Sequence, residues 1–205
     1  MSFYYFDTNA LVKLVLEEKG HEETIKIYNK EETMIIISNL SITEVHSTLN
    51  QKKSRREITE TMYEEAISAF NNVIIKSPKI IVVEITSEHY KNATSMVSKH
   101  GTLRSLDALH LATALEFIEL PITLVSADRK FSNVARIEGL EVTNFEGCKC
   151  PECGSEIVQR NSSSICPTCG RKDTKVIMRC TGEGCDYECT ECSIEFCKKY
   201  IKQVI

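Results

Sequence analysis

Four acidic residues stand where carboxylates can do chemistry, each near the start of a segment with a helical pattern. They lie in the stretches YYFDTNALVKLVLEE, ISNLSITEVHSTL, LRSLDALHLATAL and LVSADRKFSNVARIEGLEV, and they are Asp7, Glu44, Asp107 and Asp128. Converging carboxylates repel one another, and their pKa values rise unless a cation compensates. Hard divalent cations such as Mg²⁺ take oxygen ligands, and a metal in such a site activates water for phosphodiester hydrolysis. The four acids are therefore predicted to form a catalytic metal site.

Each of the four acids also has a purely structural interpretation. Asp7 and Asp128 could each be the N-cap of the helix that follows, and Ser41-Ile-Thr-Glu44 fits a capping box in which Glu44 reaches back to the helix start. Asp107, near its first turn, could simply face the positive end of the helix dipole. Taken singly, these interpretations are as good as the catalytic one or better. Taken jointly, the repeated placement of an acid at a helix start favours a shared site.

Strands that alternate with helices must position these acids. Apolar runs predict strands at 2–6, 34–37, 79–85, 122–126 and 140–142, and periodic segments predict helices at 8–18, 21–31, 42–53, 57–75, 86–101, 103–118 and 128–138. This alternation is typical of an α/β fold with a largely parallel sheet, in which functional residues lie beyond the carboxyl ends of the strands. Asp7 directly follows the first strand and Asp128 lies just past the fourth, so both are expected in one crevice.

The helix around Asp107 is apolar over most of its surface. An apolar stripe with Asp107 and His110 in its middle is formed by Leu103, Leu106, Leu111, Ala114, Phe117 and Ile118. A carboxylate that faces a core is costly unless it is paired. We therefore expect Asp107 to pair with a metal ion and with its fellow acids. His110 is expected to be a hydrogen-bonded, semi-buried histidine, with a catalytic or ligand role as the alternative.

The four stretches resemble, in order and spacing, the PIN-domain ribonucleases of the VapC toxin type, over residues 3 to about 145. The resemblance implies a parallel five-stranded sheet between helices and a Mg²⁺ or Mn²⁺ site, formed by the four acids, that cleaves RNA. It also implies that the hydroxyls of Thr8 and Ser126 orient ligands or water. Asn9 is expected to hydrogen-bond an acid. The implied partners are an RNA substrate, an antitoxin protein and a second copy of the chain.

Basic residues near the expected crevice have two interpretations. Arg104, Arg129 and Lys130 lie close to the acids in sequence, and Lys52-Lys53-Ser-Arg55-Arg56 ends one helix. They could be solvated helix ends, which is favourable for cations at a C-terminus. They could equally form an edge that binds phosphates.

All ten cysteines lie between Cys148 and Cys197, which predicts a nuclease-like domain at 1–145 and a cysteine-rich domain at 146–205. Two CPxCG turns resemble a zinc ribbon and predict a tetrahedral Zn²⁺ site from Cys150, Cys153, Cys166 and Cys169, with an iron–sulfur cluster as the alternative. A second zinc site is predicted from among Cys180, Cys185, Cys189, Cys192 and Cys197, in a pairing that stays open. Cys148 has no assigned role. The tail could bind RNA, or it could be a folding cap or protein-docking module.

The composition sets the class of protein. The chain has 205 residues, a formal charge of −4 and a hydrophobic fraction of 42%, which is enough for a core but gives no general basic signal. No apolar run is long enough to cross a membrane and no signal peptide is apparent, so a cytoplasmic protein is expected. Alternatives to a toxin-type ribonuclease are an rRNA-maturation endonuclease with a PIN domain and zinc ribbon, a non-catalytic RNA- or protein-binding module, and a DNA-binding regulator.

Overall fold

The computed structural model describes residues 1–143 and, further along the chain, three strands at 157–165, 172–180 and 188–190. The chain divides into two units, Met1–Glu146 and Gly147–Ile205. No helix in the described part of the chain is long and apolar enough to cross a membrane.

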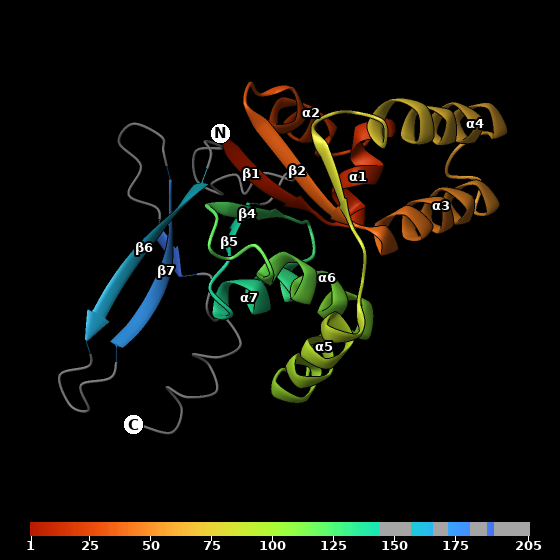
Figure 1. Ribbon diagram of the computed structural model, residues 1–205. Helices are drawn as coiled ribbons and strands as arrows, with labels where there is room; N and C mark the ends of the chain where they lie inside the picture. The colour runs from red at the N-terminus through yellow and green to blue at the C-terminus, as the bar shows by residue number, and fades with distance from the viewer. Residues whose placement is uncertain (144–156, 166–171, 181–187, 191–205) are drawn as a thin grey trace. The chain divides into compact units, whose positions relative to one another are not determined.

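Five parallel strands form the sheet of the first unit, in the order β3-β2-β1-β4-β5 (Figure 1). Their bounds are β1 Ser2–Phe6, β2 Thr33–Ser38, β3 Ile80–Val83, β4 Ile122–Val125 and β5 Glu141–Thr143. The central strand β1 pairs with β2 on one side and with β4 on the other. The predicted α/β fold with a five-stranded parallel sheet is therefore confirmed.

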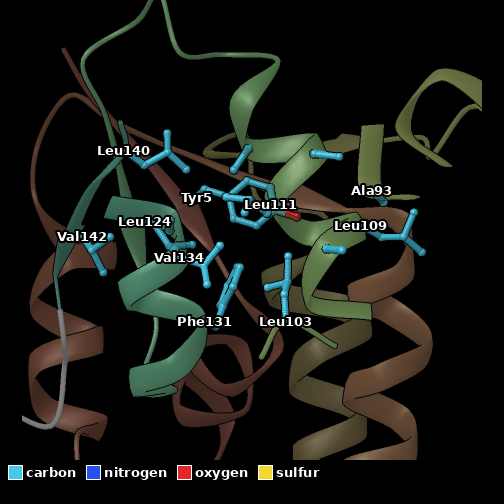
Figure 2. Packing of buried hydrophobic residues seen from close by; sticks show 14 of the residues in the cluster. Tyr5, Ala93, Leu103, Leu109, Leu111, Leu124, Phe131, Val134, Leu140 and Val142 are labelled. Carbon is cyan, nitrogen blue, oxygen red and sulfur yellow. The ribbon is translucent and has the colours of Figure 1, made fainter. Parts of the chain in front are cut away.

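Helices cover both faces of this sheet, because side chains that alternate along a strand point to opposite faces. One core contains Phe6, Ile35 and Val125 of the sheet, and the other contains Tyr5, Ile36 and Leu124. Figure 2 shows the second core, with Tyr5 and Leu124 labelled. The first core is covered by α1 Thr8–Val15, α3 Asn39–Ser54, α4 Glu60–Ala69 and the π-helix Phe70–Ile74, with residues of α2 His21–Asn29 packed against it. The second is covered by α5 Ser87–Lys99, α6 Ser105–Leu115 and α7 Arg129–Ile137.

Two helices differ from the sequence prediction in ways that have a physical cause. The single helix expected at 57–75 begins at Glu60, after the N-cap Thr59, and its last turn from Phe70 to Ile74 is a π-helix. Phe70 and Ile74, at the two ends of this π-helix, are both buried in the core that also contains Phe6. The helix expected at 42–53 begins earlier, at Asn39, because the side chain of Ser38 accepts a hydrogen bond from the N–H of Ser41 and caps it.

The predicted stripe on α6 is only partly correct. Leu103, Leu111 and Ala114 are buried, whereas Leu106 and Ile118 are 48% and 43% exposed. Residues Ala108 to Ala114 are all buried, so α6 is enclosed on nearly every side in its middle and has no single apolar face. The exposed Leu106 lies instead at the lip of the pocket described below.

The described part of the second unit is a three-stranded antiparallel sheet in the order β6-β7-β8. Its strands are β6 Ile157–Ile165, β7 Lys172–Cys180 and β8 Glu188–Thr190. Cys180 ends β7, and Cys189 of β8 pairs with Met178 of β7. The other cysteines of the two predicted zinc sites lie outside the described residues, namely Cys150, Cys153, Cys166, Cys169, Cys185, Cys192 and Cys197.

Candidate active site

All four predicted acids line one pocket of about 310 Å³ at the carboxyl ends of β1 and β4. Asp7 follows β1 and Asp128 follows β4, and these two strands are neighbours. Glu44 is on α3 and Asp107 is in the first turn of α6. The rest of the lining comes from Thr8, Asn9, Ser47, Thr48, Gln51, Arg104, Leu106, His110 and Phe131.

Asp7 is the most deeply buried of the four acids, with 5% of its surface exposed. Its Oδ1 accepts a hydrogen bond from the N–H of Ala10 at 2.8 Å, and its Oδ2 accepts one from Ser126 Oγ at 2.5 Å. Burial raises the pKa of Asp7 to about 6, although the hydrogen bonds from Ser126 and Ala10 oppose the rise. Asp7 is thus both the N-cap of α1 and a carboxylate whose negative charge is costly in this environment.

Asp128 is tied to Asp7 through Ser126. The N–H of Asp128 donates to Ser126 Oγ at 3.1 Å, which places the start of α7 beside the end of β1. Asp128 Oδ1 caps α7 by accepting from the N–H groups of Lys130 at 2.8 Å and Phe131 at 3.0 Å. Within residues 1–143, no hydrogen bond reaches Asp128 Oδ2, so this oxygen stays available at the pocket.

Glu44 is held by two donors that bond to the same oxygen. Thr8 Oγ1 donates to Glu44 Oε2, and His110 Nε2 lies 2.7 Å from that atom. Burial alone would raise the pKa of Glu44, but the hydrogen bonds from His110 and Thr8 outweigh burial and lower it. The expected capping box does not form, because the N-cap of α3 is Ser38, and Glu44 lies in the second turn.

His110 connects Glu44 to the core. It is 4% exposed, and its Nδ1 lies 2.9 Å from the hydroxyl of Tyr5 and 3.4 Å from Ser38 Oγ. The predicted hydrogen bonding of His110 agrees with this geometry, but the ring is buried and not semi-buried as predicted. The part played by Tyr5 was missed by the sequence reasoning, although a tyrosine in a buried strand usually requires a partner for its hydroxyl, and that signal could have revealed it.

Asp107 is partly buried at the rim of the pocket. Its pKa is raised by burial and by the negative charge of Asp128, and the positive charge of Arg104 opposes the rise. Arg104 is exposed, precedes α6 as its N-cap and lines the same pocket. Asp107 therefore faces the pocket and its acids rather than an apolar core.

The donor set of the pocket fits a hard divalent cation. In the described part of the chain, no three His, Cys, Asp or Glu side chains are gathered closely enough to hold a metal ion as they lie. However, the four carboxylates face a common space, and two of them, Asp7 and Asp107, have raised pKa values. Oxygen ligands with uncompensated negative charge are what Mg²⁺ or Mn²⁺ requires.

The two lysines of the predicted basic edge that lie on α3 form ion pairs with glutamates of the same unit. Lys52 Nζ lies 2.8 Å from Glu18 and 3.6 Å from Glu57. Lys53 Nζ lies 3.0 Å from Glu60 Oε1 and 4.1 Å from the centre of the Tyr63 ring. By contrast, Arg104 lines the pocket, and Arg129 and Lys130 are exposed beside Asp128. Asn9 also lines the pocket, but among residues 1–143 it makes no hydrogen bond with an acid.

The first unit is thus an α/β domain with a parallel sheet and an acidic pocket where the neighbouring strands β1 and β4 end. Residues 4–137 match the family described as "PIN domain". The chain therefore belongs to the PIN-domain family, as its sequence motifs predicted.

Two named relatives are similar to this chain in sequence. The chain is 30% identical over 106 residues to Endoribonuclease Nob1 of Pyrococcus abyssi, covering 47% of this chain and 66% of that protein. It is 26% identical over 142 residues to Ribonuclease VapC45 of Mycobacterium tuberculosis, covering 69% of this chain and 95% of the relative.

Two solved structures share the fold. FitAcB from Neisseria gonorrhoeae has a TM-score of 0.52 at 14% identity, covering 69% of this chain and 97% of that one. PAE2754 from Pyrobaculum aerophilum has a TM-score of 0.51 at 19% identity, covering 71% of this chain and 90% of that one. At these identities the likeness concerns the fold alone.

Proposed function

We propose that this chain is a divalent-metal-dependent endoribonuclease that hydrolyses RNA phosphodiester bonds. Its catalytic carboxylates are those of Asp7, Glu44, Asp107 and Asp128. The main support for the proposal is that four carboxylates from four separate segments of the chain line one pocket. The pKa values of Asp7 and Asp107, raised first by burial and further by the charge of Asp128, support it, because a bound cation would stabilise these carboxylates in their ionised form. Membership of the PIN family, with relatives named as ribonucleases, supports a nuclease.

The side chains of the pocket have separable tasks in this reaction. The four carboxylates would hold Mg²⁺ or Mn²⁺, which supplies activation of water and charge stabilisation at the leaving oxygen. Ser126 and the N–H of Ala10 fix the orientation of Asp7, and Thr8 and His110 fix that of Glu44. Arg104, on the lip of the pocket, is suited to contact a substrate phosphate.

The biological setting has two candidate forms. The resemblance to VapC-type toxins, together with similarity to Ribonuclease VapC45 over 95% of that protein, favours a toxin that acts with an antitoxin partner and forms a homodimer. Similarity to Nob1 favours an RNA-processing enzyme, and the predicted zinc sites at Cys150, Cys153, Cys166 and Cys169 and in the later cysteines would belong to that form. A binding role without catalysis predicts RNA or protein binding without any cut.

Cleavage of a mixed RNA pool with Mg²⁺ or Mn²⁺ tests the proposal. Wild type is compared with Asp107→Asn and with a control, Glu60→Gln, which changes an exposed acid on α4. We expect metal-dependent cutting by wild type and by the control, and its loss in Asp107→Asn. Equal cutting by all three would place the activity in another site or a contaminant. Mapping the product ends then separates one discrete processing cut from toxin-like cutting of a functional RNA.

A further inference from the structure

Three polar side chains connect the segments that carry the four acids. Ser126 joins Asp128 to Asp7 by accepting from the N–H of Asp128 and donating to Oδ2 of Asp7. Thr8, next to Asp7 in sequence, donates to Glu44, and His110, one turn after Asp107, contacts the same Glu44 oxygen. Glu44 is thus the point where the segment of Asp7 and the segment of Asp107 are connected.

The hydrogen bonds at Glu44 are unequally shared between its two oxygens. Both Thr8 and His110 bond to Oε2, and within residues 1–143 no hydrogen bond reaches Oε1. Because Glu44 lines the pocket, Oε1 is the oxygen left for a ligand. A carboxylate held through one oxygen has its other oxygen in a fixed orientation. Hydrogen bonds from outer residues orient metal ligands in the same way.

The partners of His110 determine which of its nitrogens carries a proton. The Glu44 carboxylate can only accept, so Nε2 is the donor in that contact. The other ring nitrogen, Nδ1, lies 2.9 Å from the Tyr5 hydroxyl and 3.4 Å from Ser38 Oγ, and in the tautomer with the proton on Nε2 it is the acceptor for these hydroxyls. Tyr5 is fully buried in the central strand, which makes it a rigid support for the ring.

We propose that His110 is a positioning residue for Glu44, held in the donating tautomer by Tyr5, and that it sets the affinity of the four-acid pocket for Mg²⁺ or Mn²⁺. This inference rests on the proposed function. It assigns His110 no contact with RNA and no proton transfer in the reaction. What it requires of position 110 is a side chain that donates a hydrogen bond to Glu44 Oε2.

Binding of Mn²⁺ to the full chain without RNA, followed by the electron paramagnetic resonance signal of free Mn²⁺, tests the inference. The pocket's share of binding is the difference between wild type and Asp107→Asn. We expect His110→Leu to weaken that binding by roughly 10- to 100-fold, as loss of an outer contact typically does. His110→Gln, whose amide N–H can still donate, should recover most of it.

A matched control is available at His89. This histidine is also buried, at 6% exposure, and its Nε2 lies 3.1 Å from Glu116, away from the four acids. His89→Leu should leave Mn²⁺ affinity unchanged, although it removes a similar histidine–glutamate contact. Thermal unfolding of each variant checks that it is folded.

The outcomes separate this inference from the proposed function. If wild type and Asp107→Asn bind Mn²⁺ equally, the metal site itself is refuted. If wild type binds but His110→Leu binds as tightly, the positioning role is refuted and the nuclease proposal stands. If His110→Gln is as weak as His110→Leu, hydrogen-bond donation is not the property that matters. Should His110→Leu fail to fold, Tyr5→Phe serves instead, with a severalfold loss of affinity expected and no loss refuting the inference.

Discussion

Ser126 Oγ donates a hydrogen bond to Asp7 Oδ2 across 2.5 Å, between residues 119 positions apart in the chain. The contact exists because β1 and β4 are parallel neighbours, so both strands end at the same edge of the sheet. The same hydroxyl accepts the N–H of Asp128 at 3.1 Å. One small side chain therefore fixes the separation of two acids in the candidate site.

Replacing Ser126 with alanine is expected to reduce RNA cleavage at neutral pH by roughly tenfold, the lower end for an outer contact. The hydrogen bond from Ser126 lowers the pKa of Asp7, so its loss should raise that pKa further and move the acidic limb of the pH–rate profile to higher pH. The matched control is Ser132→Ala, since Ser132 Oγ is buried without a hydrogen-bond partner in the described residues. Equal profiles for the two variants would contradict the role of Ser126.

The substitution Asp7→Asn should abolish cleavage and yet stabilise the metal-free protein at pH 7. Burial raises the pKa of Asp7 to about 6, so the ionised carboxylate opposes folding above that pH. A rise of about 2 pKa units corresponds to about 3 kcal/mol at most, or several degrees in Tm. The gain should shrink as the pH falls from 6 to 4, because wild-type Asp7 then becomes protonated. Unfolding curves in a chelator at pH 7 and pH 4 measure this, and a gain that grows in acid would refute the assignment.

Glu18 is predicted to stabilise the fold through its ion pairs with two lysines, Lys13 and Lys52. It lies 2.9 Å from Lys13 and 2.8 Å from Lys52, and the Lys13 side chain is only 8% exposed. Removing the carboxylate breaks two ion pairs at once in a partly buried setting, so Glu18→Ala should cost about 2–3 kcal/mol. The exposed pair of Lys53 with Glu60 provides the control, and Glu60→Ala should cost less than about 1 kcal/mol. Urea titration of both variants compares the two costs, and similar losses would count against the buried pair.

Zinc in the tail stays a prediction from the cysteine spacing. Elemental analysis of the purified full chain should find one or two Zn²⁺ ions per molecule. Cys150→Ser combined with Cys153→Ser should remove one of them, and Asp107→Asn should remove none. Iron in place of zinc would support the cluster alternative, and a chain without either metal would refute both.

The order of strands and helices and the convergence of the acids could be anticipated from the sequence. Apolar runs and helical periodicity locate the elements, and parallel strands bring residues after β1 and β4 to one edge. The roles of Asp7 and Asp128 as helix caps were also anticipated, and they coexist with their place in the pocket. A cap uses one carboxylate oxygen, so it does not exclude a second task.

Contacts between distant segments could not be anticipated in the same way. Local periodicity placed Leu106 and Ile118 in a buried stripe, but whether a helix face is covered depends on which element packs against it. The ion pairs of Lys52 and Lys53 arise from acids outside α3, which no local pattern reveals. The connection from Tyr5 through His110 to Glu44 joins three elements, and only the fold brings them together.

The central position of β1 has a consequence for synthesis. Its neighbour β4 is translated more than a hundred residues later, and Ser126 and Asp128 follow β4 directly in the sequence. A nascent chain that has emerged only as far as α6 carries Asp7, Glu44 and Asp107 but lacks the strand that completes the pocket. Under the proposed function, the unit therefore gains its full set of four acids only when the late strand docks beside the first, after most of the unit has left the ribosome.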